Sequence, residues 1–298
     1  MQPRSTAVVG PVGNRPGRAR SPDLRQLRGA DRPARTLLSA QQRAQTLTAP
    51  AAGASPAATP LPDPTALTIL AEGQIAVEGR FLWGSNFTFL ARLHHPAGEI
   101  LAVYKPQRGE RPLWDFPDGT LAAREVAAWQ TSEHLGWRLV PPTVLRSDGP
   151  LGPGSLQCYL DLDPEHHYFT FDEAEKQQLR PAALFDVLVN NADRKGGHIL
   201  IDRQSHVWLI DHGVCFHHED KLRTVVWDFA GERVPDALLE AVDRFAGELV
   251  AGDGARALFG TLLAPEEVEA LRARAAWIVE SGVFPPPGED RLYPWPLV

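Results

Sequence analysis

Apolar and polar residues alternate with a period of two through residues 74–106, QIAVEGRFLWGSNFTFLARLHHPAGEILAVYKP. This alternation is typical of strands with one buried face, and it predicts an antiparallel meander. Gly84, Ser85 and Asn86 stand between two of the apolar runs and predict a hairpin turn. The preceding segment, 65–72, has the pattern of a short helix. A β-rich unit is therefore expected in this half of the chain.

The apolar period changes to that of a helix in residues 119–136, GTLAAREVAAWQTSEHLG. Glu125 falls on the same face of this helix as Trp129, and an acidic residue on an apolar stripe is rare unless it is paired. Lys105 ends the apolar strand ILAVY, where a lysine either reaches solvent or is held by an acid. We therefore expect Lys105 and Glu125 to pair, whereas Arg124 is expected on the solvated face.

Two acidic residues end buried elements within the segment 184–216, LFDVLVNNADRKGGHILIDRQSHVWLIDHGVCF. The pattern predicts a helix end, a polar loop that starts at Asp193, and two short strands, the second of which stops at Asp211. A carboxylate at the end of an apolar run costs several kcal/mol to desolvate unless a cation, hydrogen-bond donors or a metal compensates it. Both residues are therefore expected to have partners, and Asp186 on the helix is expected to brace the loop.

The rest of the chain predicts two more strands and two more helices. Residues 137–145 are interrupted by two prolines and predict an edge strand, and 155–163 predict a strand that links the two halves of the chain. Apolar residues at helical spacing predict helices over 235–249 and 265–281. The last residues, 286–298, are proline-rich and are expected either to dock on the body in extended form or to bind a partner.

The N-terminal residues 1–63 are rich in Arg, Ala, Pro and Gly and poor in aromatic residues, a composition that cannot bury a core. Disorder is expected there, with an anion-attracting arm or a start codon further downstream as alternatives. Residues 1–50 carry nine arginines against Asp23 and Asp31, so the rest of the chain is strongly acidic within a formal net charge of −7. An acidic body without a basic stripe argues against nucleic acid as the main partner.

Composition is that of an ordinary globular protein, with 298 residues, 43% of them apolar and 22% charged. No apolar run approaches the roughly 20 residues that span a bilayer, and no signal-peptide pattern opens the sequence. We therefore expect a cytoplasmic protein without a transmembrane segment. The two cysteines, Cys158 and Cys215, match neither a disulfide framework nor a zinc spacing and are expected to be buried thiols.

Two motifs carry a resemblance to a known family. DRKGGHILID, at 193–202, and LIDHG, at 209–213, resemble the catalytic-loop and metal-binding segments of the phosphatidylinositol 3/4-kinase-like group of the protein-kinase-like superfamily, and more closely an actinobacterial branch of it. The resemblance covers about residues 68–230. It implies an α+β, two-lobed protein-kinase-like fold, with a β-rich N-lobe at about 64–160 and a small helical C-lobe at about 161–285.

The resemblance also implies roles for individual residues in an ATP site. Lys105 would contact the α- and β-phosphates, Glu125 would fix Lys105, and Asp193 would accept the proton of the attacking hydroxyl or orient it. Asp211 and His198 would hold Mg²⁺ or Mn²⁺. The other expected nucleotide contacts are Gly84, Ser85 and Asn86 over the phosphates and Gln157 and Tyr159 behind the adenine.

His198 departs from the family pattern, in which a magnesium-binding asparagine stands five residues beyond the catalytic acid. Because a nitrogen ligand suits manganese better than magnesium, either the site uses Mn²⁺ readily or His198 is not a ligand. The implied function is an ATP-dependent phosphotransferase, a kinase that transfers the γ-phosphate to an unidentified hydroxyl acceptor. A nucleotide-binding pseudokinase or regulatory module, or AMP transfer on the same fold, is the alternative.

The acceptor of such a kinase is a protein, a lipid headgroup or a small molecule, and the sequence does not select among them. A lipid kinase needs a basic loop that faces the membrane. The segment after Phe216 offers only Lys221 and Arg223 among histidines and acidic residues. A lipid acceptor is therefore not favoured over the other two.

Overall fold

The computed structural model describes four stretches of the chain, residues 64–81, 86–251, 254–288 and 292–298. The N-terminal segment 1–63, for which disorder was predicted, lies outside the described residues. The same is true of Gly84 and Ser85 in the predicted hairpin turn. Among the described residues, no helix is long and apolar enough to cross a bilayer.

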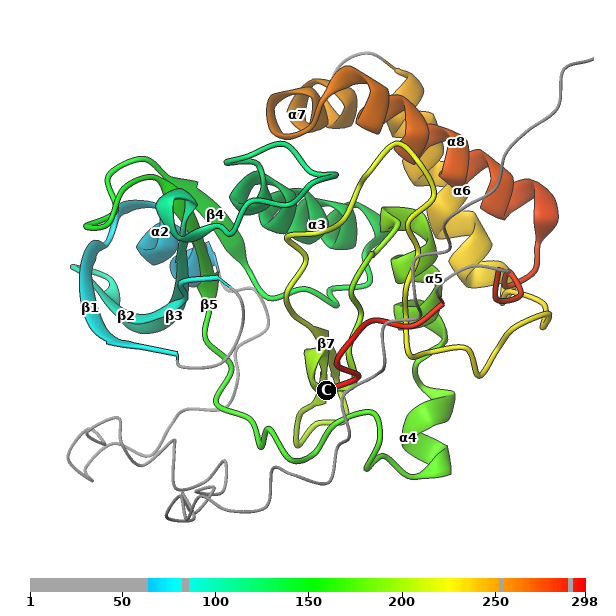
Figure 1. The fold of residues 1–298 in the computed structure, drawn as a ribbon, viewed down its shortest axis with the longest axis horizontal. Helices are drawn as coiled ribbons and strands as arrows, with labels where there is room; N and C mark the ends of the chain where they lie inside the picture. Colours follow the sequence, from blue (N-terminus) through cyan, green and yellow to red (C-terminus); the bar gives the residue numbers. More distant parts are fainter. Residues whose placement is uncertain (1–63, 82–85, 252–253, 289–291) are drawn as a thin grey trace, which may run out of the picture. The chain divides into compact units, whose positions relative to one another are not determined.

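The N-lobe is a five-stranded antiparallel sheet with the strand order β1-β2-β3-β5-β4 (Figure 1). Its strands are β1 (Gln74–Arg80), β2 (Phe89–His95), β3 (Gly98–Pro106), β4 (Thr143–Arg146) and β5 (Gly154–Cys158). Alternate side chains of β2 and β3 are buried where the two strands face α2, as the alternation predicts, and helix α2 (Pro64–Glu72) packs with Ala91, Leu93, Ala102 and Tyr104 in a small apolar core. The meander, the first helix and the edge position of β4 are confirmed.

Helix α3 (Leu121–Leu135) lies between the sheet and the helices of the other lobe (Figure 1). It ends at Gly136, whose left-handed backbone (φ 70°) few other residues adopt. The helix packs on β4 and β5, but its buried Ala127, Ala128 and Leu135 belong to the core of the helical lobe. This helix therefore connects the two lobes.

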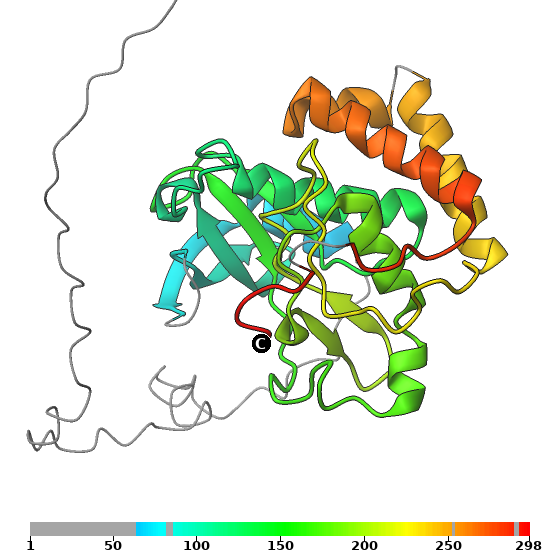
Figure 2. The same ribbon diagram turned by 45° about the vertical axis from the view of Figure 1, so that its right-hand side comes forward.

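Among the described residues, the C-lobe contains five α-helices and a two-stranded hairpin. These are α4 (Glu173–Gln177), α5 (Arg180–Val189), β6 (Ile199–Ile201), β7 (Val207–Leu209), α6 (Asp236–Val250), α7 (Ala255–Leu262) and α8 (Pro265–Ser281). In Figure 2 the last helices, drawn in orange and red, lie at the far side of the lobe from the N-lobe sheet. The two late helices predicted from apolar stripes are confirmed as α6 and α8, the latter with the predicted bounds. The α+β fold class and its two-lobed arrangement are confirmed as well.

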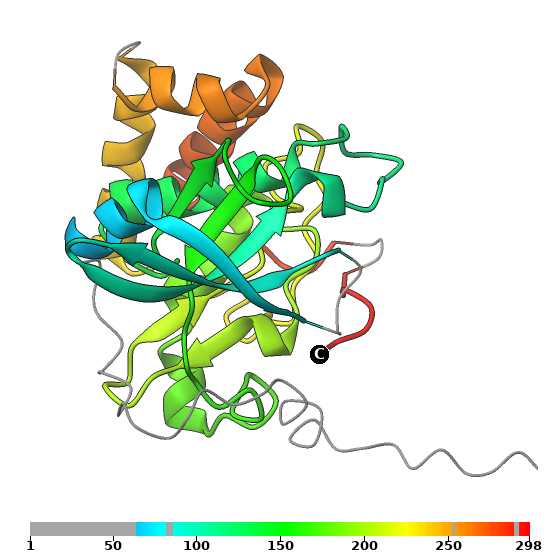
Figure 3. The same ribbon diagram turned by 90° about the vertical axis from the view of Figure 1, so that its left-hand side faces the viewer.

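The C-terminal segment Leu292–Val298 docks on the body in extended form, which was one of the two predicted possibilities. The backbone N–H of Thr224 donates to the carbonyl of Leu292 (3.2 Å), and that of Gly196 donates to the carbonyl of Leu297 (2.8 Å). In Figure 3 the end of the chain, drawn in red, lies to the right of the hairpin of the C-lobe. The tail therefore borders the loop that contains Asp193.

Candidate active site

Lys105 brings together three elements that are far apart in the sequence. It stands near the end of β3, and its Nζ atom forms one ion pair with Glu125 of α3 and a second, at 3.0 Å, with Oδ1 of Asp211 beyond β7. Burial alone would lower the pKa of Lys105, but the carboxylates of Asp211 and Glu125 outweigh that effect and raise it. The ammonium group is therefore charged, and the predicted pairing with Glu125 is present in the structure.

Glu125 links α3 to the motif that follows β7. Its side chain is only 2% exposed, and its Oε2 atom accepts a hydrogen bond from the backbone N–H of His212 (3.0 Å). Burial raises the pKa of Glu125, and Lys105 opposes that rise. Because both carboxylate oxygens accept hydrogen bonds, from Lys105 and from His212, the ionised form fits the geometry.

Asp211 lies at the open end of this group, with a side chain that is 53% exposed. Its backbone is left-handed (φ 62°), a conformation that Asp and Asn adopt more readily than other residues with a side chain. The adjacent Lys105 ammonium keeps the pKa of Asp211 well below its usual range, so the carboxylate is ionised at neutral pH. A charged carboxylate that is open to solvent is suited to hold a cation.

His198 approaches the same carboxylate. Its Nε2 atom lies 3.4 Å from Oδ2 of Asp211, and burial lowers the pKa of the imidazole to about 4, so the ring is neutral at pH 7. These two atoms are close enough to bind one divalent ion. The fit is incomplete, since Nδ1 of His198 is buried without a hydrogen-bond partner, whereas a metal-bound histidine usually donates its second N–H. Among the described residues, no three His, Cys, Asp or Glu side chains form a metal-binding group.

A buried ion pair between Arg194 and Asp186 stabilises the loop that starts at Asp193. Arg194, which is fully buried, donates from Nε to both carboxylate oxygens of Asp186 (3.0 and 3.1 Å). Its other nitrogens contact the carbonyl of Ile210 (2.8 Å) and Nε2 of His212 (2.7 Å), so one guanidinium joins the loop to the LIDHG motif. Because Arg194 is buried, Asp186 is its acidic partner and the guanidinium does not reach solvent. The bracing role predicted for Asp186 is confirmed.

Asp193 stands at the start of the loop, and its backbone N–H donates to Oδ1 of Asn191 (2.9 Å). Its carboxylate forms an ion pair with Lys195 Nζ at 3.2 Å. Burial raises the pKa of Asp193, and the charges of Lys195 and Arg223 oppose that rise. The prediction from sequence did not include Lys195, although its place two residues after the acid in the DRK motif could have indicated it.

Three of the predicted nucleotide contacts form hydrogen bonds within the protein. The Gln157 amide is buried and donates to Oγ1 of Thr143 (2.9 Å). The N–H of Tyr159 donates to the carbonyl of Leu101 (3.0 Å), because the chain continues to pair with β3 at that point. Asn86 accepts a hydrogen bond from the backbone N–H of Arg111 (2.8 Å). Each of these bonds occupies one polar group of its residue, and the nucleotide contacts stay predictions.

A cavity of about 220 Å³ lies beside the Lys105 group rather than in it. The connection between β3 and α3 forms most of its wall, with Gln107, Phe116 and Leu121 among the lining residues. Leu121 also passes close to Gly213, since a Cβ atom at Gly213 would lie 3.3 Å from that of Leu121. The charged residues at the Lys105 group, and not this cavity, define the candidate site.

No family model matches the sequence. The chain is 43% identical to Protein Rv2133c of Mycobacterium tuberculosis (strain ATCC 25618 / H37Rv) over an alignment of 263 residues, and the match covers 76% of this chain and 94% of that protein. Among solved structures, the crystal structure of a Helicobacter pylori proinflammatory kinase, CtkA, matches 72% of this chain and 94% of its own at 12% identity and a TM-score of 0.46. The extent and identity of the first match show that this chain belongs to the same family as Protein Rv2133c.

Proposed function

We propose that the protein is an ATP-dependent phosphotransferase. The observation that carries the proposal is the position of Lys105 Nζ between the carboxylates of Glu125 and Asp211. In a kinase, a strand lysine contacts the phosphates, a helix glutamate fixes that lysine, and an aspartate beyond a hairpin holds the metal. The three residues meet here from separate elements, as that mechanism requires. When ATP is bound, Lys105 would exchange its contact with Asp211 for the phosphate oxygens.

Asp211 and His198 would hold the divalent ion, which neutralises the charge that develops on the phosphates during transfer. Asp211 is ionised and His198 is neutral at pH 7, so both present lone pairs to a cation. One carboxylate and one imidazole form a set that suits Mn²⁺ better than Mg²⁺. We expect activity with both ions and a preference for Mn²⁺.

Asp193 would accept the proton of the acceptor hydroxyl while that oxygen attacks the γ-phosphorus. The bond from phosphorus to the β-bridging oxygen then breaks and ADP leaves. Lys195, at 3.2 Å from Asp193, keeps the acid ionised and adds positive charge near the transferred group. The resemblance to phosphatidylinositol 3/4-kinases leaves the acceptor open to a protein, a lipid headgroup or a small molecule. Lys221, one of the two basic residues in the segment after Phe216, is already paired with Asp115 and Glu219.

One observation favours a second candidate, a nucleotide-binding module that does not transfer phosphate. His198 occupies the place of the expected asparagine, and its Nδ1 atom has no partner to orient the ring. A weakly held metal would still permit ATP to bind through Lys105. The two functions differ in the product, because only the phosphotransferase releases ADP in the presence of an acceptor.

Asp211→Asn is expected to abolish the metal-dependent part of ATP binding. Asparagine keeps the size of the side chain and tolerates the left-handed backbone, so the change removes mainly the charge. In wild-type protein, ATP with Mn²⁺ at about a hundred times its dissociation constant should add roughly 2.7 kcal/mol to the free energy of unfolding. A thermal-shift titration with and without Mn²⁺ or Mg²⁺ measures this gain.

Asp236→Asn is the matched control, because Asp236 is exposed at the start of α6 and forms only a long ion pair with Arg233. It should respond to ATP and metal as the wild type does. If the folded wild type shows no rise with either metal, the proposed function is wrong.

Lys195→Gln is expected to move the acidic limb of the pH–activity profile to higher pH. Transfer requires ionised Asp193, so activity falls as the pH drops through the pKa of that residue. Burial raises this pKa and Lys195 opposes the rise, so removal of the cation raises the pKa further. The profile of kcat/KM against pH, measured for both proteins, tests this, and an unchanged acidic limb would exclude Asp193 as the base.

A further inference from the structure

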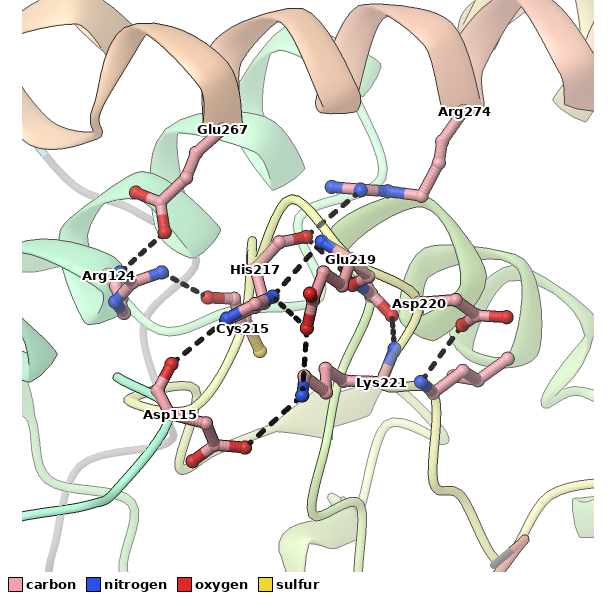
Figure 4. Close-up of polar contacts among 11 residues, drawn as sticks. Asp115, Arg124, Cys215, His217, Glu219, Asp220, Lys221, Glu267 and Arg274 are labelled. Atoms are coloured by element: carbon pink, nitrogen blue, oxygen red, sulfur yellow. Dashed lines mark hydrogen bonds and ion pairs between the residues drawn. The ribbon is translucent and has the colours of Figure 1, made fainter. Parts of the chain in front are cut away.

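A second buried ion pair holds α3 through Arg124, the residue before Glu125 in the sequence. Arg124 was expected on a solvated face, but its side chain is 1% exposed, and this prediction was wrong. Its Nη2 atom contacts Oε1 of Glu267 on α8 (2.6 Å), and its Nη1 atom donates to the carbonyl of Cys215 (2.6 Å), as Figure 4 shows. One guanidinium thus joins α3, α8 and the chain beyond the LIDHG motif.

Glu267 is equally committed, since it is 5% exposed and its second oxygen accepts the backbone N–H of Ala264 (3.0 Å) at the start of α8. Two buried charges at such a position are costly to separate, because loss of one leaves the other uncompensated. The position of α3 relative to α8 is therefore fixed by charge as well as by apolar packing.

The same helix holds the motif after β7 at three successive points. Glu125 accepts the N–H of His212, Leu121 packs against Gly213, and Arg124 donates to the carbonyl of Cys215. Because neighbouring residues on a helix point about 100° apart, Glu125 can face Lys105 while Arg124 faces α8. The segment 211–215 therefore cannot leave α3 without breaking all three contacts.

The chain beyond Cys215 is held by a second set of contacts. The carbonyl of His217 accepts from Nη1 of Arg274 (3.3 Å) on α8, and its ring donates to the carbonyl of Asp115 (2.9 Å). Lys221 bridges Asp115 (3.5 Å) and Glu219 (3.2 Å), as Figure 4 shows. The chain before and after Cys215 is therefore held by contacts with α3, with the loop that precedes α3 and with α8.

We infer that Arg124 and Glu267 are positioning residues for the metal-binding aspartate: through α3 and the carbonyl of Cys215 they hold the segment 211–215 so that Asp211 meets Lys105 and His198. This inference rests on the proposed function of Asp211 as a metal ligand. Neither residue touches the substrate. Loss of either residue is expected to weaken metal affinity. The ion pair between Lys105 and Glu125 should stay, because it includes neither Arg124 nor Glu267.

Glu267→Gln keeps the side-chain shape and removes the charge that anchors Arg124. The expected result is a 10- to 100-fold weaker apparent affinity for Mn²⁺ in the presence of ATP, a range typical of outer-sphere partners of metal ligands. Affinity for ATP without metal should stay unchanged, and a general loss of structure would not spare it. Arg124→Lys is the second variant, since it keeps the charge but cannot contact Glu267 and Cys215 together.

The matched control is Glu269→Gln, two residues further along α8, where an exposed glutamate pairs with Arg272. It should bind Mn²⁺ as the wild type does. Hydrogen exchange of the amides of 212–216, measured without nucleotide, separates the two proposals. Faster exchange in Glu267→Gln or Arg124→Lys supports the anchoring role even if the wild type binds no ATP. Unchanged exchange together with unchanged Mn²⁺ affinity in both folded variants would overturn it.

Discussion

Replacement of Asp186 by alanine is expected to lower the free energy of unfolding by roughly 3–5 kcal/mol. The carboxylate is 1% exposed and accepts hydrogen bonds from Arg194, Asn191 and Thr224. Alanine would leave the fully buried guanidinium of Arg194 without its counter-charge. At about 2–4 °C per kcal/mol for a domain of this size, the midpoint of thermal unfolding should fall by roughly 10 °C.

Calorimetry or circular dichroism during heating measures this change, with Asp236→Ala as the control. Asp236 is 86% exposed and its ion pair with Arg233 is 3.9 Å long, so its removal should cost little. A fall of less than about 1 kcal/mol in Asp186→Ala would mean that water or another group compensates Arg194, contrary to the burial described above.

Asp193→Ala is expected to reduce phosphoryl transfer by about 10²- to 10⁴-fold, the range for loss of a general base. Nucleotide binding should persist, because Lys105, Glu125 and Asp211 do not depend on Asp193 for their contacts. ADP release or label transfer in single-turnover conditions gives the rate, and the thermal shift with ATP and Mn²⁺ gives the binding.

The paired measurement separates the possible roles of this residue. Loss of transfer with binding retained supports Asp193 as the base or as the residue that orients the acceptor. Transfer that persists within a factor of about three of the wild type would contradict both roles, since a base contributes at least about 10²-fold. A variant that loses ATP binding as well would place Asp193 in the nucleotide site.

The fold could be predicted where local pattern and burial agree. The alternation in 74–106 follows from a sheet with one face on α2, and the stripe of 265–281 follows from a helix that packs on α5 and α6. Helix α4 was not predicted, since EAEKQ has no buried residue and no apolar stripe. A capping box between Asp172 and Glu175 stabilises its N-terminus instead.

The site could be predicted where a charged residue stood out against an apolar background. Glu125 on an apolar stripe and Lys105 at the end of an apolar strand each required a partner of opposite charge. In the structure the two residues pair with each other. Arg124 was expected on the solvated face of the same helix, and its partner Glu267 is 143 residues away. A contact of that separation leaves no local pattern.

Helix α3 also determines how the protein folds. Its Ala127, Ala128 and Leu135 complete the core of the helical lobe, while strands β4 and β5 of the sheet follow α3 in the sequence and pack on it. The helical lobe therefore lacks a complete core without α3, and an autonomous folding unit requires one. We expect one cooperative unfolding transition for both lobes. A fragment that ends after β5 would expose the apolar face of α3 and aggregate rather than fold.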